Sequence, residues 1–316
     1  MKHIFIINPT AGKGKAAKKI IPVINSYCKT HKLDAQLYVT KFSGDGMKYV
    51  EEIAKRGEPV RFYSCGGDGT LYEVVNGAYK YPNAEVAQVT IRQLLTHTGG
   101  TGDFFGPEFD ERRLSLKTHD DYVRLFGERA PTHPPGTEPR YSNYGFLLLG
   151  KIIEQVSGKS YYDYIDAHVF SPAGMRDSGS SPEEVAVPGR AVAYMRQDGA
   201  WTDAADTLPY RGTAAGGGYS TAGDLLKFAR ALLEGKLLSP ELLAEATRNQ
   251  TPWYGYGFMA REQEGVRMFG HAGGAPGMNG DLRIYPDLGV VVVGLANVDP
   301  PAADRLVGYY LLRMPM

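Results

Sequence analysis

The chain has 316 residues, which is enough for one large domain or two of ordinary size. Hydrophobic residues make up 43% of it and charged residues 22%, a normal globular balance with a formal net charge of zero. It has no dense basic patch interleaved with aromatic residues, so we expect no nucleic-acid partner. The N-terminal apolar run IFII is too short for a signal-peptide core or a membrane span, so we expect neither.

The zero net charge is the sum of two unlike parts. Residues 1–86 hold 13 Lys and Arg against 8 Asp and Glu, whereas residues 87–316 hold 22 against 27. Lys dominates the basic residues of the first part and Arg those of the second, which indicates two sequences of different origin. Both cysteines, Cys28 and Cys65, lie in the first part and set no disulfide framework, so we expect a reducing, cytoplasmic compartment.

Strands and helices alternate along the first 86 residues. HIFIINP, AQLYVT and VRFYSC predict strands. Helices are expected from about Lys15 to Thr30, from about Asp45 to Arg56 and over LYEVVNGAYK, with a tight turn at GGDGT. This order is typical of a parallel, Rossmann-like α/β sheet, which binds ligands at the carboxyl ends of its strands.

Both glycine-rich segments of this part follow predicted strands. NPTAGKGKAA contains Gly12-x-Gly14-x-x-Ala17, which lets backbone N–H groups approach phosphate oxygens but lacks the Walker pattern. A plain strand-to-helix turn with a solvated lysine face is the alternative for this loop. GGDGT predicts a nest of backbone donors, with Asp68 placed to meet a nucleotide or its metal.

Together these segments resemble the nucleotide-binding half of the diacylglycerol kinase catalytic domain, which bacterial lipid kinases and sphingosine kinases share. The resemblance rests on NPTAGKG, Thr40, GGDGT, Glu73 and Asn76-Gly77. It implies binding of ATP with magnesium. The family's later strand and its β-rich domain with acidic catalytic residues have no counterpart here, so we expect no phosphoryl transfer. The implied ATP-binding residues are Asn8, Thr10, Gly12, Thr40, Gly66, Gly67, Asp68, Gly69 and Thr70.

The second part predicts helices followed by an antiparallel sheet. An apolar helix is expected from about Tyr144 to Val156, with an amphipathic helix after it, and a later helix carries Asp224 in its first turn. YGYGFMA, VRMFGHAGGAPG, GDLRIYP and GVVVVGLAN predict a meander, with His271 at the end of a strand. A last helix is expected from about Pro301 to Leu312.

In order, VTIRQLLTHTGG, YSNYGFLLLGKIIE, AAGGGYSTAGDLLKFARAL and FGHAGGAPGMNGDLRIYPDLGVVVVGLAN resemble the serine β-lactamase and penicillin-binding-protein-like superfamily, in its class C and esterase branch. The resemblance implies that Tyr141 is the acid/base and that Asn143 orients a small acyl substrate. It also implies that His271, Gly273 and Gly274 form the binding strand, and it implies no cofactor. For Asn143 by itself, a capping or turn role is the alternative.

The nucleophile of that superfamily, a Ser-x-x-Lys at the start of a buried helix, is expected upstream of VTIRQLL. The only such motif in the chain is Ser26-Tyr27-Cys28-Lys29, in the first part. Ser26 falls near the end of its predicted helix, where the helix dipole disfavours an alkoxide. Ser26 and Lys29 are therefore weak candidates, and we expect a hydrolase domain that is inactive or impaired.

The sequence thus predicts a parallel, Rossmann-like α/β fragment over residues 1–86 and an α+β β-lactamase/transpeptidase-like domain with an antiparallel sheet over residues 87–316, both incomplete. Three hypotheses stay open. The chain is an impaired β-lactamase/esterase-like hydrolase behind an ATP-binding fragment, a lipid-kinase-like nucleotide-binding protein, or an artificial fusion without joint function. We favour the first combined with the third, because no single mechanism draws on residues from both parts.

Overall fold

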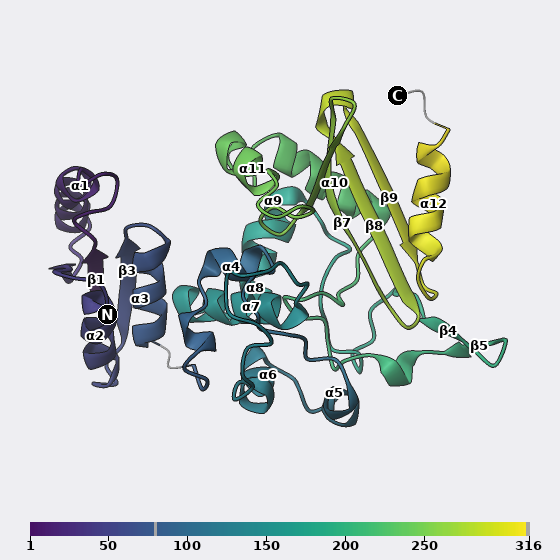
Figure 1. Ribbon diagram of the computed structural model, residues 1–316, viewed down its shortest axis with the longest axis horizontal. Coiled ribbons are helices and arrows are strands. Elements are labelled where there is room, and N and C mark those ends of the chain that lie inside the picture. Colours follow the sequence, from purple (N-terminus) through teal and green to yellow (C-terminus); the bar gives the residue numbers. More distant parts are fainter. Residues whose placement is uncertain (79–80, 314–316) are drawn as a thin grey trace.

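The computed structural model describes residues 1–78 and 81–313, which form a small N-terminal unit (1–78) beside a larger C-terminal unit (81–313; Figure 1). The N-terminal unit has a parallel sheet of order β2-β1-β3, in which Ile7 of β1 pairs with Val39 of β2 and Cys65 of β3. The expected parallel α/β arrangement is therefore confirmed. Its elements are β1 (Lys2–Ile7), α1 (Ala16–Thr30), β2 (Ala35–Val39), α2 (Asp45–Ala54), β3 (Val60–Cys65) and α3 (Asp68–Ala78).

The N-terminal sheet is covered on both faces because side chains alternate along β1. Ile4 and Ile6 are fully buried against α2 and α3, whereas Ile7 packs with α1. Helices α2 and α3 approach closely at Gly77, where an added Cβ would lie 2.5 Å from the carbonyl oxygen of Met47. Only glycine fits at that crossing.

The glycine-rich segment GGDGT is only partly the tight turn that the sequence predicted. Helix α3 already begins at Asp68, whose negative charge suits a helix start. Glu73 fixes α3 against α2, since its two carboxylate oxygens accept the N–H groups of Gly44 at 2.7 Å and Gly46 at 2.9 Å. Tyr79 and Lys80, predicted to end this helix, lie outside the described residues.

The C-terminal unit combines a helical layer with an antiparallel sheet of order β6-β7-β8-β9, so the predicted meander is confirmed. Helix α10 packs Ala229 and Leu232 against Phe269 and Ile284 of the sheet, and α12 lies against β8 and β9. Its helices are α4 (Ile91–Leu95), α5 (Pro107–Arg112), α6 (His119–Phe126), α7 (Asn143–Ser157), α8 (Tyr161–Ile165), α9 (Ser171–Ala173), α10 (Ala222–Leu233), α11 (Pro240–Ala246) and α12 (Ala302–Leu311). The strands are β4 (Tyr194–Gln197), β5 (Ala200–Asp203), β6 (Met259–Gln263), β7 (Val266–Ala275), β8 (Met278–Tyr285) and β9 (Val290–Ala296).

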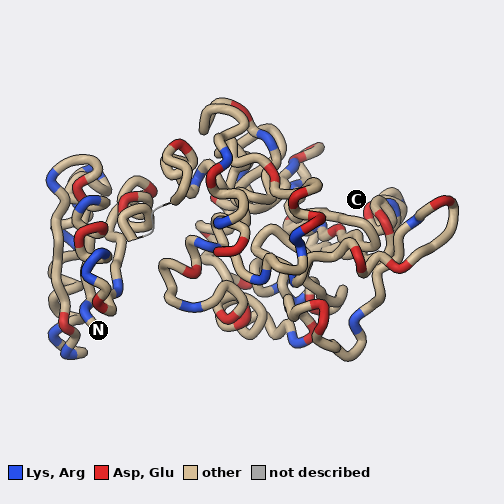
Figure 2. The backbone as a smooth tube through the Cα atoms, turned by 90° about the horizontal axis from the view of Figure 1, so that it is seen from below, with Lys and Arg blue, Asp and Glu red and all other residues tan. Residues whose placement is uncertain are grey.

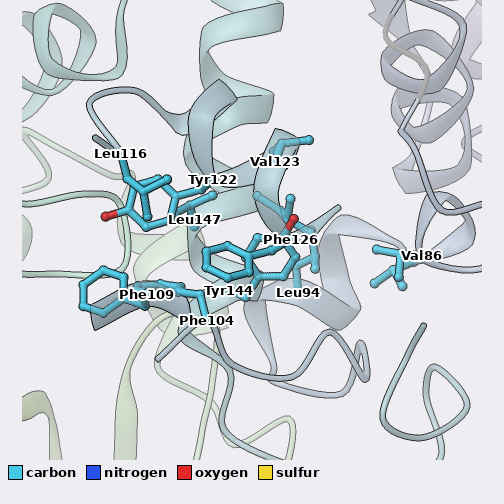
Figure 3. Packing of buried hydrophobic residues seen from close by; sticks show 12 residues of the cluster. Val86, Leu94, Phe104, Phe109, Leu116, Tyr122, Val123, Phe126, Tyr144 and Leu147 are labelled. Atoms are coloured by element: carbon cyan, nitrogen blue, oxygen red, sulfur yellow. The ribbon is translucent and has the colours of Figure 1, made fainter. Parts of the chain in front are cut away.

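Helix α7 is the centre of the helical layer. Figure 3 shows Tyr144 and Leu147 of α7 among Tyr122 and Phe126 of α6 and the neighbouring Phe104. All five side chains are less than 5% exposed. This packing fixes the start of α7, and with it the Tyr141 segment, relative to the rest of the unit.

Two sequence predictions for this unit need correction. The amphipathic helix expected after α7 is broken, because α8 passes into a single π-helical turn (Asp166–Phe170) before α9. His271 lies within β7 and not at its end, because pairing with β8 continues through the glycines to Ala275. The sheet therefore extends through the predicted binding segment.

Charges of both signs are interspersed along both units (Figure 2). Within residues 1–78 and 81–313, no helix is both long and apolar enough to cross a membrane.

Candidate active site

Tyr141 stands just before α7, at a position that the helix start determines. Ser142 caps α7, since its hydroxyl accepts the N–H of Gly145 at 2.9 Å. The Tyr141 ring is 41% exposed and lies with its centroid 4.2 Å from that of His97 and 6.2 Å from that of His271. Burial, with a contribution from the charge of Asp103, raises the pKa of Tyr141.

Asn143, the first residue of α7, is held by an acidic neighbour. Its side-chain amide donates a hydrogen bond to the carboxylate of Asp103 at 2.7 Å. The helix cap is Ser142 and not Asn143, so the alternative role that the sequence left open for Asn143 is filled by the preceding residue.

Strand β7 faces Tyr141 through His271, and we use the name candidate pocket for the site between Tyr141 and this strand. Pairing between β6 and β7 ends at Met259 and Gly270, so among the described residues no strand pairs with β7 on this side from His271 onward. Gly273 and Gly274 lie on this open edge and are both exposed. An open strand edge offers backbone N–H and C=O groups to a ligand in the manner of an added strand.

Asn279 of the neighbouring strand β8 fixes this edge through hydrogen bonds. Its amide donates to the carbonyl oxygen of Gly273 at 2.8 Å, and its oxygen accepts the N–H of Ala303 at 2.7 Å. At Gly274, an added Cβ would lie 2.3 Å from the ring of Pro300, so a side chain does not fit there. The two glycines therefore differ, because at Gly273 an added Cβ meets no atom within 4 Å.

His271 is a neutral imidazole with a hydrogen bond at each ring nitrogen. Its Nδ1–H donates to the carbonyl oxygen of Ala272 at 2.6 Å, and its Nε2 accepts the hydroxyl of Tyr254 at 2.9 Å. Burial lowers the pKa of His271, which the hydrogen bond to Ala272 partly opposes. The ring therefore orients the pocket wall as a neutral group at pH 7.

His97 is 1% exposed, packs against the Tyr141 ring and was not among the residues that the sequence singled out. Its Nδ1 accepts the N–H of Ser142 at 3.1 Å, which leaves the proton on Nε2, a buried atom without a hydrogen-bond partner in residues 1–78 and 81–313. Burial, together with the nearby His271, lowers the pKa of His97 to about 4. The aromatic rings around His97 are those of Tyr141, Phe146, Trp253 and Tyr254.

The candidate nucleophile pair lies elsewhere. Ser26 and Lys29 are exposed residues of α1, which Figure 1 places at the far end of the molecule from β7. The carbonyl of Ser26 accepts the hydroxyl of Thr30 at 2.9 Å, as is usual within a helix. The structure therefore does not bring Ser26 and Lys29 together with Tyr141 and His271.

The predicted nucleotide residues lie together at the carboxyl edge of the N-terminal sheet. Asn8, Thr40 and Gly66 each follow the end of a strand, and backbone bonds link them, with Asn8 N–H donating to Cys65 at 3.0 Å and Thr40 N–H to Ile7 at 2.9 Å. Asn8 also orders the first loop, because its side-chain oxygen accepts the N–H of Thr10 at 2.9 Å and the Thr10 hydroxyl at 2.8 Å. Gly12 follows in the same loop with φ of 59°.

Two residues of the second glycine-rich segment, which runs from Gly66 and Gly67 through Gly69 to Thr70 in the first turn of α3, decide how it would meet a ligand. The hydroxyl of Thr70 is buried and has no hydrogen-bond partner among the described residues. Asp68, by contrast, forms an ion pair at 3.3 Å with Arg92 of α4, in the C-terminal unit. Among residues 1–78 and 81–313, no group of three or more His, Cys, Asp or Glu residues is arranged to hold a metal.

A profile of the family described as Beta-lactamase matches residues 66–313, and the chain belongs to this family of penicillin-binding proteins and serine hydrolases. A profile of the diacylglycerol kinase catalytic domain matches residues 2–105. Both resemblances are thereby confirmed, and the two matches overlap over residues 66–105, which include α3 and α4.

Among curated proteins, penicillin-binding protein 4 of Amycolatopsis lactamdurans is 30% identical over 73% of this chain and 65% of its own length. Esterase EstB of Burkholderia gladioli is 29% identical over 54% of each chain. The chain thus spans roughly half to two thirds of the length of these two relatives.

Solved structures agree in fold. A penicillin-binding protein from Bacillus halodurans has 29% identity and a TM-score of 0.68, covering 84% of this chain and 83% of its own. A D-stereospecific amidohydrolase from Streptomyces sp. has 26% identity and a TM-score of 0.62, covering 83% of this chain and 81% of its own. Residues 87–316 are only 230 of the 316, so both superpositions include part of the chain before residue 87.

Proposed function

We propose that the C-terminal unit binds a small acyl compound, a β-lactam or a short-chain ester, between Tyr141 and the edge of β7, without forming an acyl-enzyme. The observation that carries the proposal is the facing pair of Tyr141 and His271, 6.2 Å apart between ring centroids, beside an open strand edge. The relatives named above include a penicillin-binding protein and an esterase, which sets the ligand class.

Each pocket residue has a distinct task in this proposal. Backbone groups of Gly273 and Gly274 pair with the amide of the ligand and donate to its carbonyl oxygen. Asn143 orients the ligand from the start of α7. Tyr141, with its raised pKa, stays protonated at neutral pH and donates a hydrogen bond.

Turnover fails in this proposal for want of a hydroxyl nucleophile. Ser142, the serine next to Tyr141, has its hydroxyl bound to Gly145 N–H at 2.9 Å and to the Thr101 hydroxyl at 2.8 Å. It serves α7 as a cap and is less than 5% exposed. Without a nucleophile in reach of the ligand carbonyl, pre-organised donors leave only weak residual catalysis.

The proposal is tested by binding and hydrolysis together. Calorimetric titration with benzylpenicillin should show binding to the wild-type chain and about fivefold to tenfold weaker binding to Tyr141→Phe, which loses one hydrogen bond. Arg124→Gln on α6, where Arg124 is exposed and paired with Asp121, serves as the control with unchanged affinity. Sustained hydrolysis of the penicillin, abolished in Ser26→Ala, would contradict the proposal.

A second candidate function is nucleotide binding by the N-terminal unit. It is favoured by the unpartnered Thr70 hydroxyl at the start of α3 and by the clustering of Asn8, Thr40 and Gly66 at one sheet edge. Backbone N–H groups from Gly66 to Gly69 and the hydroxyl of Thr70 would hold ATP phosphates, and Asp68 would meet the accompanying magnesium, which neutralises phosphate charge when bound. Magnesium-dependent ATP binding that Asp68→Ala abolishes would support this function, whereas no binding at millimolar ATP would contradict it.

We also propose that the two parts of the chain, residues 1–86 and 87–316, share no catalytic mechanism, as expected of a fusion of two unrelated sequences. Cys28 and Cys65 are both free thiols, which suits a reducing, cytoplasmic compartment. Separate unfolding of the two units would support this description.

A further inference from the structure

One side chain of the C-terminal unit contacts the candidate nucleotide loop and a loop of the candidate acyl pocket at once. Arg92 pairs through Nε with the Asp68 carboxylate at 3.3 Å. Its guanidinium lies 5.2 Å from the ring centroid of Tyr256, and Nη1 donates to the Tyr256 hydroxyl. Arg92 therefore joins the first turn of α3 to the segment that precedes β6.

That segment leads directly into the pocket. Tyr256 is two residues from Tyr254, whose hydroxyl holds His271 at 2.9 Å. Trp253, next in the chain to Tyr254, has its ring centroid 5.7 Å from that of His97. A displacement of Tyr256 would therefore move Tyr254 and Trp253, the rings at the candidate pocket, because only two residues separate Tyr256 from Tyr254.

The helix that carries Arg92 supplies a second path to the same rings. Helix α4 ends at Leu95, whose carbonyl accepts the N–H of Gly257 at 3.4 Å, and His97 follows two residues later. Both the helix and the Tyr256 segment therefore end near His97, and Arg92 sits where they meet.

We propose that Arg92 is a positioning residue shared by the two candidate sites, so that the state of Asp68 alters ligand affinity in the acyl pocket. When Asp68 binds the magnesium of a bound nucleotide, its ion pair with Arg92 breaks. Arg92 then positions Tyr256 differently. This coupling rests on the proposed functions for its ligands, but the contact itself does not. It gives the two units a connection in binding, though not in catalysis.

The expected coupling is small. The side chains of Asp68 and Arg92 are 57% and 55% exposed, and exposed ion pairs contribute little because water and salt screen them. Changes in acyl-ligand affinity of about twofold to fivefold are therefore expected, and they should shrink at high salt.

The test uses the full chain with Trp201→Phe, which leaves Trp253 as the sole tryptophan and places the fluorescent probe at the pocket. In this background, Arg92→Gln and Asp68→Asn should each shift the emission of Trp253 without any ligand. Arg92→Lys, which keeps the charge, should restore part of the shift. Arg124→Gln removes an ion pair with an exposed arginine elsewhere on the C-terminal unit and should leave the emission unchanged.

Benzylpenicillin affinity, with and without millimolar magnesium-ATP, then measures the coupling. We expect magnesium-ATP to change the affinity of the wild-type chain by about twofold to fivefold and that of Arg92→Gln not at all. The double variant should differ from the wild type no more than either single variant does, because both remove one contact. Additive single effects, or an equal magnesium-ATP effect in wild type and Arg92→Gln, would overturn the inference.

The two measurements, ligand-free Trp253 emission and ligand affinity, also separate this inference from the proposed functions. If the wild-type chain binds neither penicillin nor ATP, the proposed functions fail, and the ligand-free emission alone decides the role of Arg92. Emission of Arg92→Gln and Asp68→Asn identical to the parent would overturn the inference regardless of ligand binding.

Discussion

The hydroxyl of Tyr254 lies 2.9 Å from Nε2 of His271 and fixes the tautomer of that ring. The other ring nitrogen of His271 faces the carbonyl oxygen of Ala272 at 2.6 Å, and a carbonyl only accepts, so the proton sits on Nδ1. Tyr254 itself is 1% exposed, and burial raises its pKa, so its hydroxyl stays a donor. The Tyr254–His271 pair is therefore uncharged and fixes the orientation of the His271 ring beside Tyr141.

Removing that hydroxyl should raise the pKa of His271. Tyr254→Phe takes away a hydrogen bond that favours the neutral ring, so proton binding at Nε2 becomes easier than in the wild type. The free energy of unfolding should fall by about 1 kcal/mol at pH 7. Titration of the His271 ring protons by NMR measures the shift, with Tyr309→Phe on the exposed face of α12 as control. An unchanged titration in Tyr254→Phe would show that the hydrogen bond does not set this pKa.

Two neighbouring glycines of β7 should respond differently to substitution by alanine. Gly274→Ala places a methyl group 2.3 Å from the Pro300 ring, so the free energy of unfolding should fall by about 1–3 kcal/mol. Gly273→Ala meets no atom within 4 Å, so its stability should stay near that of the wild type while penicillin affinity falls. Urea unfolding and calorimetric titration of both variants measure the two effects. Equal stability of the pair would refute the difference between the glycines.

Lowering the pH should reduce the free energy of unfolding because His97 takes up a proton more easily in the unfolded chain. Its pKa is about 4 in the folded chain against about 6.5 when unfolded, so between these values the unfolded state binds more protons. The stability that the neutral His97 ring contributes to the free energy of unfolding is fully present above pH 6.5. About 3 kcal/mol of it is lost as the pH falls to 4. Urea unfolding at several pH values should show a smaller acid loss in His97→Gln than in the wild type. Parallel pH profiles would contradict the assignment to His97.

The two units should unfold at different denaturant concentrations. Both cysteines lie in the N-terminal unit and both tryptophans in the C-terminal unit, so thiol labelling and tryptophan fluorescence report on the units separately. Their buried clusters are distinct, one around Ile4 and Ile6 and another around Phe126 and Leu147. We expect the labelling midpoint of Cys28, which is 7% exposed, to differ from the fluorescence midpoint. Coincident midpoints would count against two independent units.

Much of the fold follows from local sequence patterns. The strand VRFYSC is observed as β3, and the apolar helix expected over residues 144–156 is observed as α7 over Asn143–Ser157. Prediction failed where tertiary pairing decides the outcome. Glycines suggest the end of a strand after His271, yet pairing with β8 carries β7 to Ala275. Likewise GGDGT suggests a turn, but packing on α2 extends α3 back to Asp68.

The candidate site was accessible from the sequence only through its motifs. Tyr141 and His271 were found because each belongs to a recognisable stretch. His97 and Tyr254 carry no comparable local signal, since their importance comes from rings that meet across 4.5 Å. The pairing of Asp68 with Arg92 was invisible for the same reason, because it joins two segments that the sequence assigns to different parts.

The central claim, that the acyl pocket binds without forming an acyl-enzyme, is tested most directly by intact-protein mass spectrometry. The folded chain is incubated with a reactive penicillin and, separately, with an activated short-chain ester. We predict an unchanged mass with both reagents, since α1, which carries Ser26, lies apart from α7 (Figure 1), and the Ser142 hydroxyl is engaged as a helix cap. A stoichiometric acyl adduct that maps to Ser26, or to any other serine, would contradict the account and make the hydrolase assignment a working mechanism.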